Sequence, residues 1–494
     1  MQYISTRNNA VTFSAAQAIS RGLAADGGLL TPCYIPKLPG NALEELKDMS
    51  YQNRAVYIMK LFLEEFSVKE LTDYAAAAYG SGKFDDPAVA PVRTVDDKTH
   101  CLELWHGPTC AFKDMALQML PHLLTASLQK IEEKRTVCIL TATSGDTGSG
   151  ALSGFKDVPN TRILVFYPKN GVAAVQELQM TTQEGSNVGV CAVYGNFDDA
   201  QTGVKRLFSD EALREELNQK GYYFSSANSI NWGRVLPQIV YYVSAYCDML
   251  RDGKIRPGET VNVCVPSGNF GNILAAYYAK EMGVPFGRLV CASNKNNVLT
   301  EFIRTGVYDR NRTFFNTMSP SMDILISSNL ERMLLAMSQD TAEVKGYMDT
   351  LNAEGRYQVS EKVLENLHKQ FGAYCCDDEE TQRVIGRIYA EHNYLVDPHT
   401  AVAFSAVDQY RAETGDQTAF LVSSTASPFK FCDSVLGGLG ETEFAEGLDV
   451  LDQLSAKTGL PAPKPLASLR GKEVRFDQVV EKENMVDAVR GILV

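Results

Sequence analysis

Short apolar runs alternate with segments of helical spacing from about residue 100 to residue 425. The apolar runs resemble strands buried on both faces, and the clearest are at 136–141, 188–193, 261–265 and 419–424. The segment 272–282 repeats apolar residues at helical spacing and ends at Gly283, a typical helix C-cap residue. Strands that alternate with helices predict a mostly parallel sheet in a doubly wound α/β fold.

The composition is that of a globular protein with room for two or three domains. The 494 residues are 45% apolar and 22% charged, with a formal net charge of −13. Because nucleic acids and many membranes are anionic, we expect neither as a partner. The eleven cysteines form no Cys-x-x-Cys pair, as in reduced proteins. With no recognisable signal peptide or membrane span, we expect a cytoplasmic protein that is a monomer or weak homodimer.

A glycine turn, Pro266-Ser-Gly-Asn-Phe-Gly, joins the strand at 261–265 to the helix at 272–282. Such a turn leaves backbone N–H groups directed at one point, which makes an anion site, most often for phosphate. No Gly-Lys-Ser/Thr follows, and the Gly-x-x-Gly spacing differs from that of a dinucleotide-binding loop. An ordinary strand-to-helix turn explains this motif equally well.

Lys113 stands between an apolar loop and a predicted helix start, with Phe112 and Met115 beside it. Desolvation in such a setting destabilises the ammonium form of lysine. The free amine can then form a Schiff base or act as a base. A solvated lysine at a helix start is the alternative.

A second strand-to-helix turn, Thr143-Ser-Gly-Asp-Thr-Gly, offers another amide-lined anion pocket. Thr143, Ser144 and Thr147 add hydroxyl donors. Asp146 is unusual in an anion site and indicates a cation or hydroxyl donor nearby. A capped helix packed closely on a sheet is the alternative.

Two further polar positions complete a possible site. Thr425 directly follows the strand at 419–424. In a parallel sheet the carboxyl ends of the strands face the ligand crevice. The Thr425 hydroxyl there can form a hydrogen bond with a neutral ring nitrogen. Arg234 can bind phosphate or carboxylate with two N–H groups, and Asn228, Ser229 and Asn231 precede it. A loop threonine and a surface arginine are the alternatives. Together, these features match the Schiff-base lysine, phosphate cup and ring-nitrogen partner that pyridoxal phosphate needs.

Motifs along nearly the whole chain resemble those of the threonine synthases, which belong to the tryptophan-synthase-β-like, or fold type II, pyridoxal-phosphate enzymes. The matching stretches begin at Gly22, Phe112, Ala142, Tyr167, Gln176, Asn228, Pro266, Ser319 and Ser424. The long N-terminal part resembles the subgroup of fungi and many bacteria. The chain departs from the pattern at Ser427, where many relatives have histidine, and at Phe429, where a smaller residue is usual.

The resemblance implies a fold type II enzyme with two doubly wound parallel-sheet domains and a separate N-terminal domain. We expect the N-terminal domain at 1–95 and a small α/β domain at 141–224. A large cofactor-binding domain would comprise 96–140 and 225–494, with an irregular insertion near 294–358.

The resemblance also implies a reaction, in which O-phospho-L-homoserine and water give L-threonine and phosphate by γ-elimination and β-addition. Lys113 would be the catalytic residue. The cofactor would be bound by Lys113, Asp146, Ser267, Gly268, Asn269, Phe270, Gly271, Asn272 and Thr425. The substrate would be bound by Thr143, Ser144, Gly145, Thr147, Lys169, Asn228, Ser229, Asn231 and Arg234. The alternatives are a threonine or serine dehydratase of the same fold, a nucleotide-binding enzyme and a non-catalytic relative.

Overall fold

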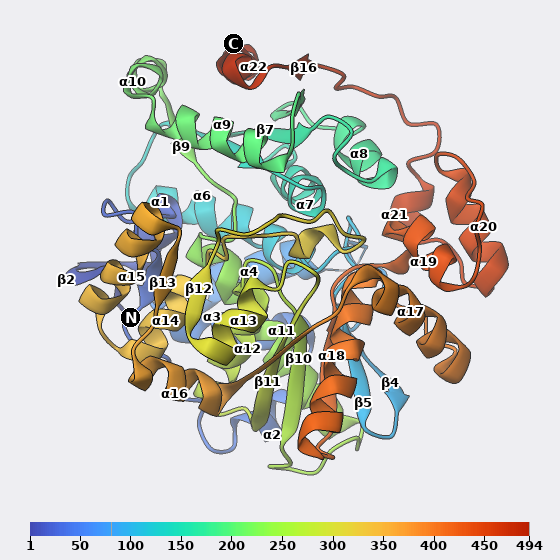
Figure 1. Ribbon diagram of the computed structural model, residues 1–494. Coiled ribbons are helices and arrows are strands. Elements are labelled where there is room, and N and C mark those ends of the chain that lie inside the picture. Colours follow the sequence, from blue (N-terminus) through green and yellow to red (C-terminus); the bar gives the residue numbers. More distant parts are fainter. Residues whose placement is uncertain (81, 494) are drawn as a thin grey trace.

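A computed structural model describes residues 1–80 and 82–493 of the chain. Ser81 and Val494, which fall within the expected N-terminal and large domains, lie outside the described residues. Two sheets organise the molecule: a five-stranded sheet in the upper part of Figure 1 and a six-stranded sheet in the lower part. The N-terminal segment packs beside the lower part.

The N-terminal segment is a small unit with its own antiparallel sheet, in the order β2-β1-β3. Its elements are β1 (Tyr3–Ser5), β2 (Asn8–Phe13), α1 (Ala15–Arg21), β3 (Leu30–Pro32), α2 (Ala42–Leu46), α3 (Tyr51–Phe62) and α4 (Val68–Tyr79). Ser14, Ser50 and Ser67 begin α1, α3 and α4, because each hydroxyl accepts an otherwise unpaired N–H of the first turn. Tyr3 and Phe62 both pack on Trp232, with ring centroids 5.7 Å apart, so this unit shares a core with the rest of the chain.

The six-stranded sheet has the order β14-β11-β10-β15-β5-β4. Its strands are β4 (Val92–Asp96), β5 (Thr99–Glu103), β10 (Val261–Pro266), β11 (Phe286–Ser293), β14 (Phe371–Cys375) and β15 (Phe420–Ser424). All neighbours are parallel except β4 and β5, which pair antiparallel at one edge. The parallel strands therefore end at one edge, where the predicted loops after β5, β10 and β15 begin.

The five-stranded sheet is parallel, in the order β16-β8-β7-β6-β9. Its strands are β6 (Thr136–Ala142), β7 (Thr161–Pro168), β8 (Val188–Val193), β9 (Tyr222–Ser225) and β16 (Val479–Val480). The helices of this part are α7 (Asp146–Phe155), α8 (Ala174–Thr181), α9 (Phe197–Ser209), α10 (Glu211–Gln219) and α22 (Met485–Ile492). The C-terminal segment thus returns to the upper sheet in Figure 1.

Strand pairing divides the chain differently from the expected domain limits. All of β6 belongs to the five-stranded sheet, whereas the expected limit at 140/141 cuts through this strand. The two residues of β16 also pair with β8 of that sheet and α22 packs against β8, although the sequence suggested a large domain running to 494. The pairing of β16 with β8 joins segments far apart in sequence, and local patterning carries no sign of it. The domain limits themselves stay a prediction.

The segment expected to be irregular, near 294–358, contains short regular elements: α13 (Val298–Thr305), β12 (Val307–Asp309), the 3₁₀ turn η1 (Pro320–Met322), α14 (Leu330–Ser338), α15 (Thr341–Glu354) and β13 (Arg356–Gln358). The other elements are α5 (Asp114–Leu117), α6 (Leu120–Lys130), α11 (Trp232–Arg251), α12 (Gly271–Met282), α16 (Glu361–Gln370), α17 (Asp378–His392), α18 (Pro398–Thr414), η2 (Pro428–Lys430), α19 (Cys432–Gly438), α20 (Asp449–Thr458), α21 (Lys464–Ala467) and η3 (Lys482–Asn484). None of the described helices is long and apolar enough to cross a membrane.

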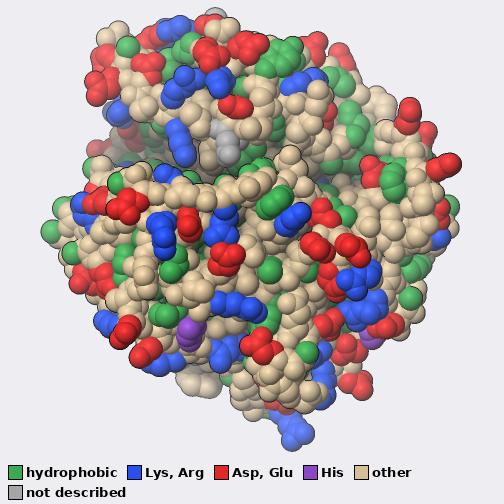
Figure 2. Space-filling view, viewed as in Figure 1, with side chains coloured by type: hydrophobic (Ala, Val, Ile, Leu, Met, Phe, Trp, Pro, Cys, Tyr) green, Lys and Arg blue, Asp and Glu red, His purple; other side chains and the backbone are tan. Residues whose placement is uncertain are grey.

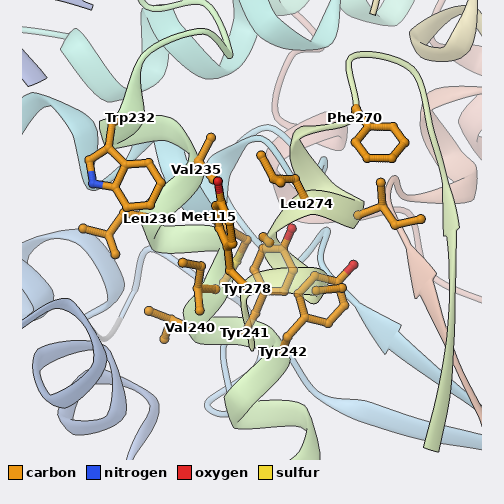
Figure 3. Close-up of a cluster of buried hydrophobic side chains, with 14 of the residues drawn as sticks. Met115, Trp232, Val235, Leu236, Val240, Tyr241, Tyr242, Phe270, Leu274 and Tyr278 are labelled. Carbon is orange, nitrogen blue, oxygen red and sulfur yellow. The ribbon is translucent and has the colours of Figure 1, made fainter. Parts of the chain in front are cut away.

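Helix α11 runs through the centre of the molecule with almost all of its side chains buried. It packs against α12 and α3, while α18 contacts the strands of the six-stranded sheet. Figure 3 shows Trp232, Tyr241 and Tyr242 of α11 in one cluster with Leu274 and Tyr278 of α12. This core fixes the start of α12, and with it the glycine turn that follows β10.

Candidate active site

The predicted loops meet at one cavity of about 650 Å³. Figure 2 shows the surface hollowed beneath the upper part of the molecule. Both sheets and the N-terminal unit contribute to its wall. The cavity brings together these predicted residues: Lys113, Thr143, Ser144, Thr147, Asn228, Ser229, Arg234, Ser267, Gly268, Asn269, Phe270, Gly271, Asn272 and Thr425.

Four predicted residues do not line the cavity. Asp146 lies directly behind its wall, in contact with Lys113. Gly145, at a φ of +129°, is packed so tightly that an added Cβ would lie 2.4 Å from the Gln176 amide. Asn231 instead caps α11, since it accepts the Gly233 N–H (2.8 Å) and donates to the Ile19 carbonyl (2.9 Å). The Lys169 side chain is 38% exposed and lies 3.5 Å from Glu177.

Lys113 begins α5 and directs its amine into the site. Its Nζ lies 3.3 Å from Asp146 Oδ2 and 3.3 Å from Ser321 Oγ, and the side chain is 12% exposed. Burial lowers the pKa of Lys113, and the positive charges of Lys430 and Arg234 act in the same direction, against the attraction of Asp146. A larger fraction of Lys113 is therefore a neutral amine, the form that attacks carbonyl carbons and accepts protons.

The glycine turn after β10 is held in place by its own backbone. Ser267 donates from its N–H to the Ala292 carbonyl (2.9 Å) and from its hydroxyl to the Val265 carbonyl (2.9 Å). Phe270 adopts a left-handed conformation, with φ 64°, just before α12. The first N–H groups of α12 have no helical acceptor, so they remain available to an anion. A Cβ on Gly268 would lie 2.6 Å from the Ser321 carbonyl oxygen, so only glycine fits there.

Asn272 adds an unused donor to this turn. Its Oδ1 accepts hydrogen bonds from the Tyr241 and Tyr242 hydroxyls, at 2.8 and 2.5 Å, which fixes the orientation of the amide. Its Nδ2 is buried and has no acceptor within the described part of the chain. A buried donor without a partner is costly in an empty protein, and a phosphate oxygen would satisfy it.

The turn before α7 also presents donors. The Thr143 hydroxyl oxygen accepts the N–H groups of Gly145 (2.9 Å) and Gly148 (2.8 Å), so its hydrogen is free to donate. Burial opposes ionisation of Asp146, but Lys430 and Lys113 outweigh burial and hold the pKa of Asp146 far below its usual range. Two lysines and the Ser321 hydroxyl thus lie beside Asp146, where the sequence indicated a cation or a hydroxyl donor.

Arg234 is buried at the cavity wall, only 3% exposed. Its Nη1 donates to the Ala227 carbonyl (2.6 Å), whereas its Nε has no partner within residues 1–80 and 82–493. No described carboxylate lies within 4 Å of it. Burial lowers the pKa of Arg234 to about 10, so it stays charged at neutral pH. A buried cation with an unused donor fits an anionic ligand.

Thr425 is buried at the end of β15 and lines the same cavity. Its carbonyl accepts the N–H of Phe112 (2.8 Å), which ties the Lys113 loop to the end of β15. The predicted Schiff-base lysine and the predicted ring-nitrogen partner are therefore held together by the backbone.

Sequence reasoning assigned no role to three residues that shape the site. Lys430 forms an ion pair with Asp146, at 2.7 Å. The Ser321 N–H donates to His399 Nε2 (3.2 Å), and His399 Nδ1 donates to Asp397 Oδ2 (2.6 Å). Lys430 and Ser321 lie in the motifs that begin at Ser424 and Ser319. In the sequence, the position of Lys430 between Phe429 and Phe431 is the one feature that indicates a buried charge.

Comparison with known proteins places this site within a family. The model of pyridoxal-phosphate dependent enzymes matches residues 100–424, and the model of the threonine synthase N terminus matches residues 2–79. The threonine synthase of Saccharomyces cerevisiae is 36% identical over 99% of this chain and 97% of that protein. Threonine synthase-like 1 of Homo sapiens is 40% identical over 87% of this chain, but the aligned part is only 58% of that protein.

Solved structures agree with these matches. The pyridoxal-phosphate-bound threonine synthase of Brucella melitensis is similar with a TM-score of 0.88 and 34% identity, covering 100% of this chain and 99% of that one. The threonine synthase of Escherichia coli has a TM-score of 0.77 and 29% identity, covering 100% and 99%.

The fold and the lysine-centred cavity are those of a pyridoxal-phosphate-dependent enzyme of fold type II. Both matching models and the full-length relatives narrow this class further. The chain belongs to the threonine synthase family, which confirms the family and the fold class expected from its motifs.

Proposed function

We propose that this protein converts O-phospho-L-homoserine and water to L-threonine and phosphate, with pyridoxal 5′-phosphate as its cofactor. One observation carries the proposal: two separate groups of residues line the cavity that holds Lys113, and each has an unpaired donor, Asn272 Nδ2 in the turn 267–272 and Nε of Arg234. A phosphorylated substrate on a phosphorylated cofactor needs two phosphate sites. The names and coverage of the relatives support the same reaction.

The cofactor would be held by Lys113, by the turn 267–272 and by Thr425. Pyridoxal phosphate supplies, when bound, an aldehyde for amines and a ring that delocalises negative charge from a substrate carbon. The unpaired Nδ2 of Asn272 and the crowded Cα of Gly268 fit a phosphate at the turn. Thr425 offers an uncharged hydroxyl to the ring nitrogen, which favours a neutral ring.

The chain's own residues would bind the substrate and move its protons. Thr143, Ser144 and Thr147 would hold the substrate carboxylate, because all three line the cavity at the start of α7 and carry hydroxyl donors. Arg234, with Asn228 and Ser229, would hold the substrate phosphate and stabilise its charge as it leaves. Lys113 would take the proton from the α-carbon and carry protons at the β-carbon, since burial lowers its pKa and so favours the neutral amine.

Turnover of defined substrates tests the proposal. The purified holoenzyme should release phosphate from O-phospho-L-homoserine and form threonine in equal amounts. A threonine or serine dehydratase would instead release ammonia from unphosphorylated threonine or serine. Dehydration without phosphate release would overturn the proposal.

Borohydride reduction tests the role of Lys113. Reduction of the holoenzyme should fix the cofactor on the peptide that contains Lys113, and Lys113→Ala should abolish this labelling. A label on another lysine would show that the assignment is wrong.

We also propose that the enzyme acts in the cytoplasm, as a monomer or weak homodimer. All eleven cysteines are free, as in a reducing compartment. Sedimentation at several protein concentrations would measure the oligomeric state.

A further inference from the structure

Lys430 is a buried lysine beside the site, and its ammonium group contacts Asp146 and the Thr109 carbonyl. It ends η2, after β15, and its side chain is 0% exposed. Its Nζ lies 2.7 Å from Asp146 Oδ1 and donates to the Thr109 carbonyl, at 2.8 Å. A lysine removed from water in this way stays charged only if a partner compensates for its lost hydration.

Asp146 is shared between two lysines. Its Oδ1 faces Lys430 and accepts a hydrogen bond from Gln176 Nε2 (2.8 Å). Its Oδ2 faces Lys113 and accepts from the Ser321 hydroxyl, at 3.3 and 3.2 Å. One buried carboxylate can neutralise one ammonium, so the cluster carries an excess positive charge if both lysines are protonated.

The geometry shows which lysine is paired more closely with Asp146. Lys430 is closer to the carboxylate, is less exposed and has a second acceptor in the Thr109 carbonyl. Lys113 has longer contacts, and its other partner is a hydroxyl that also donates to Asp146. Short contacts between charged groups are the stronger ones, so Asp146 pairs more strongly with Lys430 than with Lys113.

We infer that Lys430 is a positioning residue that acts through Asp146, occupying the carboxylate as its permanent counter-charge and thereby leaving Lys113 as a free amine. This inference rests on the proposed role of Lys113 as the cofactor-bearing lysine, and it holds for any substrate. It explains why an aspartate stands in a turn otherwise suited to anions.

The arrangement also serves the site when Lys113 carries no charge. A lysine bound to the cofactor or released as a free amine gives Asp146 no ammonium partner. Without Lys430, a carboxylate that is 3% exposed would then be left unpaired, which is strongly destabilising. With Lys430 in place, Asp146 keeps a counter-charge whether or not Lys113 carries a proton.

Other titratable groups face the cluster and stay the same in every variant. They are Arg234 from α11, His399 from α18, Asp114 from α5 and the Cys110 thiol. Burial raises the pKa of Asp114 to about 6, and Thr109 donates to both of its carboxylate oxygens. Because these groups are unchanged in the variants, a difference between variants reports on Lys430 and Asp146.

The test measures the protonation of Lys113 in the cofactor-free protein. Trace labelling with acetic anhydride across a range of pH, followed by mass spectrometry, gives the pH at which the amine becomes reactive. Exposed Lys69 is the internal reference, with its side chain 84% exposed. Lys430→Gln should move the Lys113 profile upward by about one pH unit or more, a tenfold fall in neutral amine at a given pH.

Lys430→Gln leaves a buried carboxylate unpaired and could therefore fail to fold. A second pair of variants, both carrying Asp146→Asn, avoids this problem. Asp146→Asn leaves Lys430 as an uncompensated neighbour, so the Lys113 profile should move downward. Adding Lys430→Gln to Asp146→Asn removes that repulsion, and the profile should rise again by about one unit. Lys280→Gln removes another partly buried lysine, at the far end of α12, and should leave the profile unchanged.

Identical profiles in Asp146→Asn and in the double variant would overturn the inference, as would an unshifted profile in folded Lys430→Gln. Because labelling reads Lys113 without cofactor or substrate, it can succeed even if phosphohomoserine is not turned over. Failure of the proposed function is therefore distinguishable from failure of this inference.

Discussion

Arg234 is the residue whose burial most needs a bound anion. It is 3% exposed, its Nε lacks a partner among the described residues, and no described carboxylate lies within 4 Å of it. A guanidinium in this position loses hydration that only an incoming ligand can replace.

Arg234→Ala should therefore impair turnover of O-phospho-L-homoserine while leaving the visible spectrum of the bound cofactor intact. Loss of one partner of a buried charge contact costs about 2–5 kcal/mol, or about 30-fold to several thousand-fold in kcat/KM. Slow reactions on unphosphorylated amino acids should survive, because they make no use of the second phosphate site.

A matched control is Arg383→Ala, which removes an arginine with 69% of its side chain exposed, in contact with Glu380 rather than the cavity. It should turn over phosphohomoserine normally. If Arg234→Ala also does so, the substrate phosphate binds elsewhere.

In the turn between β10 and α12, substitutions of two glycines can distinguish an effect on cofactor binding from an effect on folding. An added Cβ at Gly271 would meet only side chains, at 3.3 Å from Asn329 Nδ2 and 3.8 Å from Gln238 Nε2. At Gly268 it would meet backbone, the Ser321 carbonyl, at 2.6 Å. The first position can accept a methyl group by a small shift of a neighbour, and the second cannot.

Gly271→Ala should weaken cofactor binding at least about tenfold, because the methyl group occupies space at the phosphate turn. The melting temperature of the cofactor-free protein should change little. Cofactor titration followed by absorbance, together with calorimetry, measures both. Equal losses of stability and binding would indicate that Gly271 serves packing alone.

Gly346→Ala is the control for this change, since it lies in α15 with nothing within 4 Å of the added Cβ. It should leave cofactor affinity unchanged and stabilise α15 by about 0.5–1 kcal/mol.

At the scale of the whole molecule, His106 joins the end of β5 to the segment that leaves the N-terminal unit. Its Nε2 lies 2.9 Å from Glu103 Oε2, and its Nδ1 contacts Asp85. Burial lowers the pKa of His106, but hydrogen bonds to the two carboxylates outweigh burial and raise it to about 9.

A histidine whose pKa is raised on folding stabilises the protein while it is protonated in the folded state. The contribution is complete below the unfolded value of 6.5 and is lost as the pH rises through about 9. The shift corresponds to a contribution on the order of 3 kcal/mol. Urea unfolding at pH 6, 7.5 and 9.5 should show stability falling across this window in the wild type.

His106→Gln should flatten that fall and lower stability at pH 6. His122→Gln is the control, because burial lowers the pKa of His122 and keeps it neutral above pH 6.5. A wild-type slope in His106→Gln would exclude the histidine as its source.

Features that depend on neighbouring residues could be predicted from the sequence. The strand at 261–266, the glycine turn and α12 with its Gly283 cap follow from β-branched runs, glycine and helical spacing. The positions of Lys113 and Thr425 beside strand ends follow from the alternation of strands and helices, since parallel strands end at one edge of a sheet. The family and fold were therefore predictable from motifs.

The folded structure was needed to show which groups far apart in the chain meet. It made Asn231 a helix cap, kept Lys169 out of the cavity wall and returned β16 to β8. It also placed Lys430 against Asp146. Pairing between distant groups depends on which of them are buried together. A charge removed from water, or an unpaired strand edge, is stabilised by the partner that the fold brings into contact with it. No local sequence pattern specifies that partner.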